Sequence, residues 1–132
     1  MTSREVAIEI DGVVKSAAFE CDRKVMAMTV TMPDGLVRSY AAADLYLCLG
    51  MVRKDFPDVN FLCKGAKINV YPSRMSSQMA GGVVAYEVRW GESAGKADIV
   101  NIFDYEDKDL TNDITKQADY HQRWLQSLNA GS

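Results

Sequence analysis

Hydrophobic and polar positions alternate with a period of two along the first forty residues. Val6, Ile8 and Ile10 alternate with polar or small neighbours, which is typical of a strand with one buried face. Asp11-Gly12 then favours a type I′ turn, because both positions of that turn need a positive φ angle. The turn residues Pro33-Asp34-Gly35 indicate a second hairpin. We therefore expect an antiparallel meander with strands at 5–10, 13–20, 25–32 and 36–40.

From residue 41 the apolar period lengthens to that of a helix. The apolar stripe is Leu45, Cys48, Leu49, Val52 and Phe56, whereas Asp44, Arg53, Lys54 and Asp55 fall outside it. Pro57 ends the helix, because proline disfavours a helical conformation in the residue before it. We expect this helix to cover one face of the sheet.

The rest of the chain predicts more strands and two more helices. A short helix has Ser73 as its N-cap and Gly81 as its left-handed C-terminal residue. Met75 and Met79 share one face of this helix and are expected to fill the core. A terminal helix begins near Asp113, and its apolar stripe is Ile114, Ala118, His121, Leu125 and Leu128. Further strands are predicted at 59–64, 67–71, 83–90 and 98–103.

These elements indicate an α+β fold. We expect an antiparallel or mixed sheet built from hairpins, with the two main helices packed mostly on one face. The 132 residues fit one domain, and a domain of that size buries roughly two thirds of its unfolded surface. We assign the single domain to residues 1–129 and a frayed C-terminus to residues 130–132.

Composition and charge narrow the classes of function. A hydrophobic fraction of 48% and a charged fraction of 25% are typical of globular proteins. No stretch reaches the roughly 18 apolar residues of a membrane span, and the N-terminus lacks the apolar core of a signal peptide. We therefore expect a cytoplasmic protein without membrane contacts. The net charge of −3 disfavours direct binding of nucleic acid, which depends on cationic side chains.

The residues that commonly hold metals or cofactors are sparse. Cys21, Cys48 and Cys63 lie in apolar runs without a paired spacing, so we expect reduced, buried thiols. His121 is the only histidine, which leaves the common zinc sites without ligands. The acids at 104–109 lack the glycine and terminal glutamate of a calcium-binding loop. We predict no metal site and no cofactor.

The segment Gly91-Glu92-Ser93-Ala94-Gly95 matches the GxSxG pattern of serine hydrolases. In those enzymes the serine lies on a sharp turn between a strand and a buried helix. Here the β-branched stretch 98–103 follows the serine, and His121 falls on the apolar stripe of the last helix. We interpret residues 91–95 as a connecting loop, and we expect no catalytic residues and no enzyme activity.

Negative charge is concentrated between Asp104 and Asp113, which hold five acids and one lysine, whereas the other residues sum to +1. Such a run is either a solvated loop or a binding edge for a cationic partner. Tyr105 lies within it, and tyrosine is enriched at interfaces. The candidate partner-binding residues are Asp104, Tyr105, Glu106, Asp107, Asp109 and Asp113.

One resemblance points in the same direction. It is carried by Asn-Val-Tyr-Pro-Ser-Arg-Met-Ser-Ser-Gln-Met-Ala-Gly-Gly at 69–82, by Ala85-Tyr86 and Gly91, and by Asp-Ile-Val-Asn-Ile-Phe-Asp at 98–104. These residues resemble small bacterial proteins of the toxin-immunity type. The resemblance implies a bacterial, cytoplasmic protein that neutralises a cognate toxin, such as a nuclease, by occluding its basic active site.

The alternative is a small enzyme or a domain that binds an anionic ligand around residues 71–82. The candidate ligand-binding residues are Tyr71, Ser73, Arg74 and Gln78. A helix N-terminus beside an arginine suits an anion, whereas the simpler interpretation is a short capped helix. The oligomeric state remains open.

Overall fold

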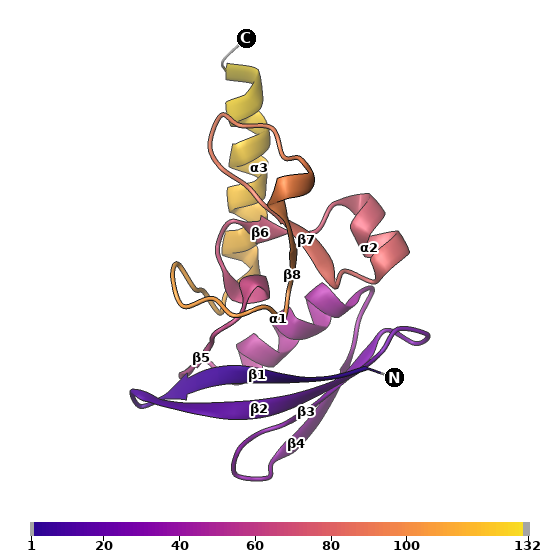
Figure 1. Ribbon diagram of the computed structural model, residues 1–132, viewed down its shortest axis with the longest axis vertical. Coiled ribbons are helices and arrows are strands. Elements are labelled where there is room, and N and C mark those ends of the chain that lie inside the picture. The colour runs from indigo at the N-terminus through magenta and orange to yellow at the C-terminus, as the bar shows by residue number, and fades with distance from the viewer. Residues whose placement is uncertain (1, 131–132) are drawn as a thin grey trace.

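The computed structural model describes residues 2–130 and has the predicted α+β fold (Figure 1). A five-stranded antiparallel sheet is built in the order β4-β3-β2-β1-β5. Its strands are β1 (Thr2–Ile10), β2 (Val13–Asp22), β3 (Ala27–Thr31), β4 (Val37–Ala41) and β5 (Val59–Phe61). The predicted meander is thus confirmed, and β5 closes it by pairing with β1.

The tight turn between β1 and β2 explains the register of these two strands. Asp11 and Gly12 both have positive φ angles, 51° and 78°, and they join Ile10 directly to Val13. The strand predicted from residue 25 starts two residues later. Its first positions belong instead to a turn in which Met26 has a φ of 50°.

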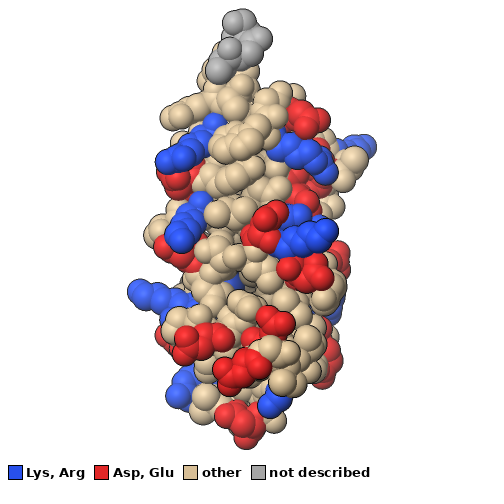
Figure 2. Space-filling model, turned by 90° about the vertical axis from the view of Figure 1, so that its left-hand side faces the viewer, with Lys and Arg blue, Asp and Glu red and all other residues tan. Residues whose placement is uncertain are grey.

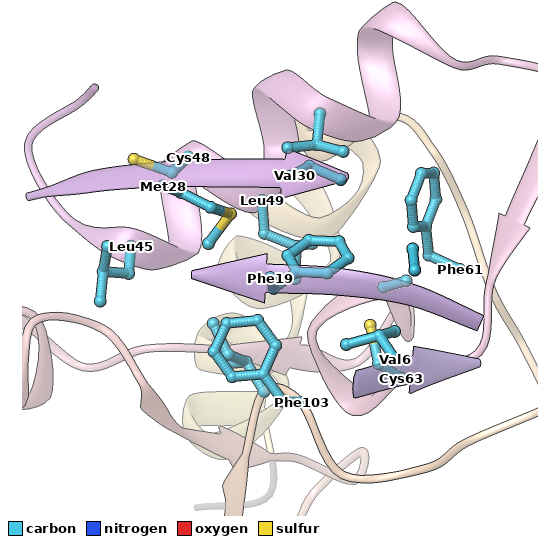
Figure 3. Packing of buried hydrophobic residues seen from close by; sticks show 14 of the residues in the cluster. Val6, Phe19, Met28, Val30, Leu45, Cys48, Leu49, Phe61, Cys63 and Phe103 are labelled. Atoms are coloured by element: carbon cyan, nitrogen blue, oxygen red, sulfur yellow. The ribbon is translucent and has the colours of Figure 1, made fainter. Parts of the chain in front are cut away.

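Helix α1 (Leu45–Asp55) covers one face of this sheet. It begins at Asp44, whose Oδ1 accepts a hydrogen bond from the backbone N–H of Leu47 at 2.8 Å. The buried side chains between helix and sheet interdigitate (Figure 3). Phe19 lies at the centre, with its ring 6.4 Å from that of Phe61 and 5.8 Å from that of Phe103. Burial of each large apolar side chain contributes about 1.5–3 kcal/mol.

The prediction that Arg53 lies outside the buried stripe of α1 is wrong. Its side chain is fully buried, and Asp44 is also buried. The guanidinium is tolerated because oxygen atoms surround it: it donates to the carbonyls of Leu49 and Thr111 and to Oε1 of Gln117. Helical periodicity identifies apolar side chains and does not reveal a polar side chain that finds partners inside.

A second, three-stranded antiparallel sheet has the order β6-β7-β8. Its strands are β6 (Val70–Tyr71), β7 (Val84–Glu87) and β8 (Ile99–Asn101), and the two short 3-10 helices are η1 (Lys64–Ala66) and η2 (Lys96–Asp98). The strands predicted at 59–64 and 67–71 are shortened by η1. Gly65 of η1 packs so closely that a Cβ atom there would lie 2.5 Å from Cδ2 of Leu49.

Helix α2 (Arg74–Ala80) has both predicted caps. Oγ of Ser73 accepts from the N–H of Ser76 at 3.0 Å, and Gly81 is left-handed with a φ of 64°. The expectation that its methionines fill the core is wrong, because Met75 is 69% exposed and Met79 is 75% exposed. The helix lies on the surface and buries none of its residues completely.

Helix α3 (Ile114–Ala130) packs against β6, at the end of the molecule away from the large sheet (Figure 1). The two main helices therefore pack against different sheets. The predicted stripe is rotated: Gln117 and Trp124 are buried, whereas Leu125 is 40% exposed. Polar contacts decide this rotation, because Gln117 and the Trp124 indole both donate to backbone carbonyls.

The prediction of a frayed C-terminus at residues 130–132 is only partly covered by the structure. Ala130 is the last residue of α3, and residues 131–132 lie outside the described residues. Within residues 2–130, no helix combines the length and the apolar composition that a membrane crossing requires.

Candidate functional site

The acidic strap, defined as residues Asp104–Asp113, runs from the end of β8 to the start of α3. Main-chain contacts hold it in place: Tyr105 forms a β-bridge with Cys63, and Leu110 forms one with Lys67. The N–H of Ile68 also donates to the carbonyl of Asp109 at 2.8 Å. The predicted partner-binding residues therefore lie on an ordered backbone.

Five of the six predicted residues on the strap face solvent. They are Asp104, Tyr105, Asp107, Asp109 and Asp113. Tyr105 is 62% exposed, and its hydroxyl lies 3.4 Å from Oδ2 of Asp107. Asp104 lies 3.4 Å from Nη2 of Arg4, a pair with both side chains substantially exposed. Exposed pairs of this kind contribute little to stability, so both partners are available for other contacts.

Asp113 has a local structural role. It precedes α3, and its Oδ1 accepts hydrogen bonds from the hydroxyl and the N–H of Thr115. These bonds lower the pKa of Asp113 below its ordinary value. Asp113 therefore starts the terminal helix, as its position in the sequence predicts.

Glu106 differs from the other acids because it is only 9% exposed. Its carboxylate belongs to an ion cluster of Lys64, Lys67, Glu87 and Glu106. The two ammonium groups lie 3.0 and 2.8 Å from Oε1 of Glu106, and the same two groups lie 2.7 and 3.1 Å from the carboxylate of Glu87. Glu106 therefore attaches the strap to the domain and does not contribute to the exposed charge.

The ion cluster is fully ionised at neutral pH. Burial by itself would raise the pKa of Glu106, but hydrogen bonds from Lys67 and Lys64 outweigh it and lower the pKa to about 2. Burial alone would lower the pKa of both lysines, yet the two carboxylates raise it above the ordinary value. The lysines thus stay protonated, which argues against a role as amine nucleophiles.

The second predicted site lies at a cavity of about 440 Å³ beside α1, α2 and α3. All four predicted ligand-binding residues line this cavity: Tyr71, Ser73, Arg74 and Gln78. The structure adds Asp44, Ser77 and His121 to the lining. The carboxylate of Asp44 is already occupied, because it accepts from the N–H of Leu47 and from the hydroxyl of Ser77.

His121 contributes an aromatic wall to this cavity. Its ring stacks on Tyr71 with centroids 4.6 Å apart and an interplanar angle of 19°. Burial lowers its pKa, so the imidazole is neutral at pH 7, and its buried Nδ1 has no hydrogen-bond partner within the described residues. Sequence reasoning placed His121 on the apolar stripe of α3 and missed its place at the cavity. Its position one turn before Trp124 was the available signal.

The remaining motif residues lie apart from both sites. Ser93 is in an exposed loop that leads into η2 and β8, as interpreted from the sequence. The three cysteines are buried and unbonded, as expected, and burial raises the pKa of Cys21 and Cys63 to about 11. In the described part of the chain, no three His, Cys, Asp or Glu side chains are grouped to hold a metal ion.

Comparison with protein-family models finds no match for this chain, and comparison with curated protein sequences finds none either.

Proposed function

We propose that this chain is a binding protein of the toxin-immunity type, which acts in the bacterial cytoplasm. In this role it neutralises a cognate toxin by covering a basic active site, and it performs no chemistry itself. The observation that carries the proposal is the group of exposed carboxylates around the exposed ring of Tyr105 on the acidic strap. Carboxylates complement the charge of a cationic cleft, and their long-range attraction accelerates association of the two proteins.

The ordered backbone of the strap supports this function. The β-bridges and the ion cluster hold the strap in one conformation before any partner arrives. A pre-organised binding surface loses less conformational entropy on association than a flexible one. Tyr105 provides a rigid aromatic anchor among the charges, which is the type of residue that dominates many interfaces.

The test uses the purified product of the reading frame adjacent to the gene for this chain. A strap variant, Asp104→Lys/Asp107→Lys, reverses two exposed acids without removing a backbone hydrogen bond. We expect its affinity for that product to fall at least tenfold, which corresponds to about 1.4 kcal/mol. The control variant, Glu92→Lys/Asp119→Lys, changes the net charge equally on exposed positions outside the strap. Equal affinities of the native chain and the strap variant would remove the strap from the interface.

A growth assay tests the biological role. Expression of the adjacent product alone should arrest growth, and co-expression of the native chain should restore it. The strap variant should restore growth less well than the control variant at equal protein levels. Absence of growth arrest, or restoration by an unrelated acidic protein, would contradict an immunity role.

A second candidate function is binding of a small anionic ligand in the cavity lined by Tyr71, Arg74 and His121. The specific observation is that the exposed cation of Arg74 lines the same cavity as the ring of His121, whose buried Nδ1 has no hydrogen-bond partner within residues 2–130. Titration with inorganic phosphate, followed by backbone amide NMR, should shift the signals of Ser73 and Arg74, and Arg74→Ala should abolish the shifts. An unchanged spectrum at millimolar phosphate would reject this function.

A further inference from the structure

The face of the five-stranded sheet that is turned away from α1 is called the outer face here, and no helix or strand formed by residues 2–130 packs on it (Figure 1). Side chains alternate between the two faces along each strand. Even-numbered residues of β1 face α1 and include the buried Val6 and Ile8, so the odd-numbered residues face outward. The strand pairing carries this alternation across the sheet. None of the outward residues of β1–β4 is buried.

Charge is completely sorted between the two faces of strands β1–β4. Every acid on these strands lies on the outer face: Glu5, Glu9, Glu20 and Asp22. Every lysine or arginine on these strands lies on the other side: Arg4, Lys15 and Arg38. Charges that serve only solubility would include both signs on one exposed face. On the outer face of β1–β4, the charged residues are all acids.

Most of the other positions on the outer face carry small side chains. They include Ala7, Ser16, Ala18, Thr29, Thr31 and Ser39, which neighbour one another through the strand register. These short side chains leave the sheet surface open to a partner, with Val14 and Val37 exposed near the β1–β2 and β3–β4 turns. The four acids lie along the adjacent strands β1 and β2, and the outward positions beside them on β3 carry short neutral side chains that would not block a docking protein.

The outer face continues into the acidic strap. Glu9 lies opposite Asn60 in the pairing of β1 with β5, and Nδ2 of Asn60 donates to Oε1 of Glu9 at 3.0 Å. The negative charge of Glu9 in turn helps to raise the pKa of the exposed Tyr105 hydroxyl, after burial and Asp107. Figure 2 shows several acidic side chains over the lower part of the molecule, the part built by the large sheet (Figure 1), with some lysine or arginine side chains among them.

We infer that the outer face of the five-stranded sheet is the main docking platform for a cationic protein partner, with the acidic strap as its rim. This inference rests on the proposed binding function and names the surface that performs it. The uniform negative charge favours a partner surface rich in lysine and arginine. The same charge repels a second copy of this face and repels nucleic acid. The partner that we propose is therefore a different, cationic protein.

The experiment measures the affinity of the same partner for the native chain, the strap variant, the control variant and a face variant, Glu5→Lys/Glu20→Lys. All three variants change the net charge by the same amount, and Glu5 and Glu20 are both exposed on the outer face. A further variant, Glu5→Gln/Glu20→Gln, keeps the side-chain shape and removes only the charge, so it tests the same face with less risk of misfolding. Far-UV circular dichroism checks that each variant is folded. The partner is the product of the adjacent reading frame, and affinities are measured by calorimetry in 50 mM and 300 mM salt.

We expect the face variant to weaken binding at least tenfold at low salt. The glutamine variant should weaken it several-fold, and the control variant should change it less than twofold. Weakening by the strap variant alone would overturn the platform and leave the proposed function standing. Binding unaffected by all of the variants, or no binding to the native chain, would overturn both. Concentration-dependent dimerisation of the native chain that the face variant abolishes would assign this face to self-association and overturn the inference.

Discussion

Arg53 of α1 donates from Nη2 to Oε1 of Gln117 of α3 at 2.7 Å, and neither side chain is exposed to solvent. Gln117 in turn donates from Nε2 to the carbonyls of Gly65 and Lys67 at 2.9 and 2.8 Å. This buried pair links both main helices to the turn that carries the ion cluster. Nη1 of Arg53 also donates to the carbonyl of Thr111, so the pair holds the C-terminal end of the acidic strap.

Breaking this pair should destabilise the fold strongly. Arg53→Met leaves the carbonyl of Thr111 and Oε1 of Gln117 without their donor, and Gln117→Leu removes one acceptor from a buried guanidinium. Each change should lower the free energy of unfolding by about 2–4 kcal/mol. The double variant should lose at least about 1 kcal/mol less than the sum, because the two residues act through one contact. Urea denaturation measures all three, with the exposed neighbour variant Lys54→Met as control. Additive losses would show that the contact carries no coupling.

The ion cluster should make stability depend on pH in the acid range. The pKa of Glu106 is lowered from an ordinary value of 4.5 to about 2, so its contribution is complete above pH 4.5 and is lost as the pH falls towards 2. We expect this loss to be on the order of 1–2 kcal/mol. Glu106→Gln should be less stable than the native chain at pH 7 and should show a smaller decrease between pH 4.5 and pH 2. Thermal unfolding at a series of pH values, with Asp107→Asn as control, measures both effects. Parallel pH profiles for the native chain and Glu106→Gln would contradict the role of Glu106.

Gly65 should be intolerant of a side chain. A Cβ atom added there would lie 2.5 Å from Cδ2 of Leu49 and 2.9 Å from Cβ of Ile102, and both of these residues belong to the core. Gly65→Ala should therefore lower the free energy of unfolding by about 1–3 kcal/mol through overpacking. Gly95→Ala is the matched control, because no atom lies within 4 Å of a Cβ there, and its effect should stay within about 0.5 kcal/mol. Similar stabilities of the two variants would show that the core adapts at Gly65.

The three thiols should be unreactive in the folded protein. Cys21, Cys48 and Cys63 are buried, and burial raises the pKa of each thiol. Little thiolate therefore exists at pH 8, and reagents have poor access to it. Iodoacetamide should modify the native chain slowly and should modify all three cysteines in urea, as counted by intact mass spectrometry. Rapid labelling of one cysteine in the native state would reveal a reactive thiol.

Several features of the fold could be predicted from the local sequence. The Asp11-Gly12 turn and the alternation of Val6, Ile8 and Ile10 define the first hairpin, because turn conformation and side-chain period depend on neighbouring residues. The same alternation places Glu5 and Glu9 on one face of β1 and Arg4 on the other, and the structure shows which of these faces is buried. The capped helix from Ser73 to Gly81 was predicted for the same local reason.

The fold class, the hairpins and the helix caps follow from local conformational preference and periodicity, and the acidic run at 104–113 is present in the sequence itself. Which polar groups are buried depends instead on contacts between segments that lie far apart in the chain. Glu106 and Asp107 are neighbours in one acidic run, yet Glu106 is buried against Lys64 and Lys67, whereas Asp107 faces solvent. Arg53 is buried because carbonyls and an amide from distant segments meet it. Such partners lie far away in sequence, so no local pattern could reveal them.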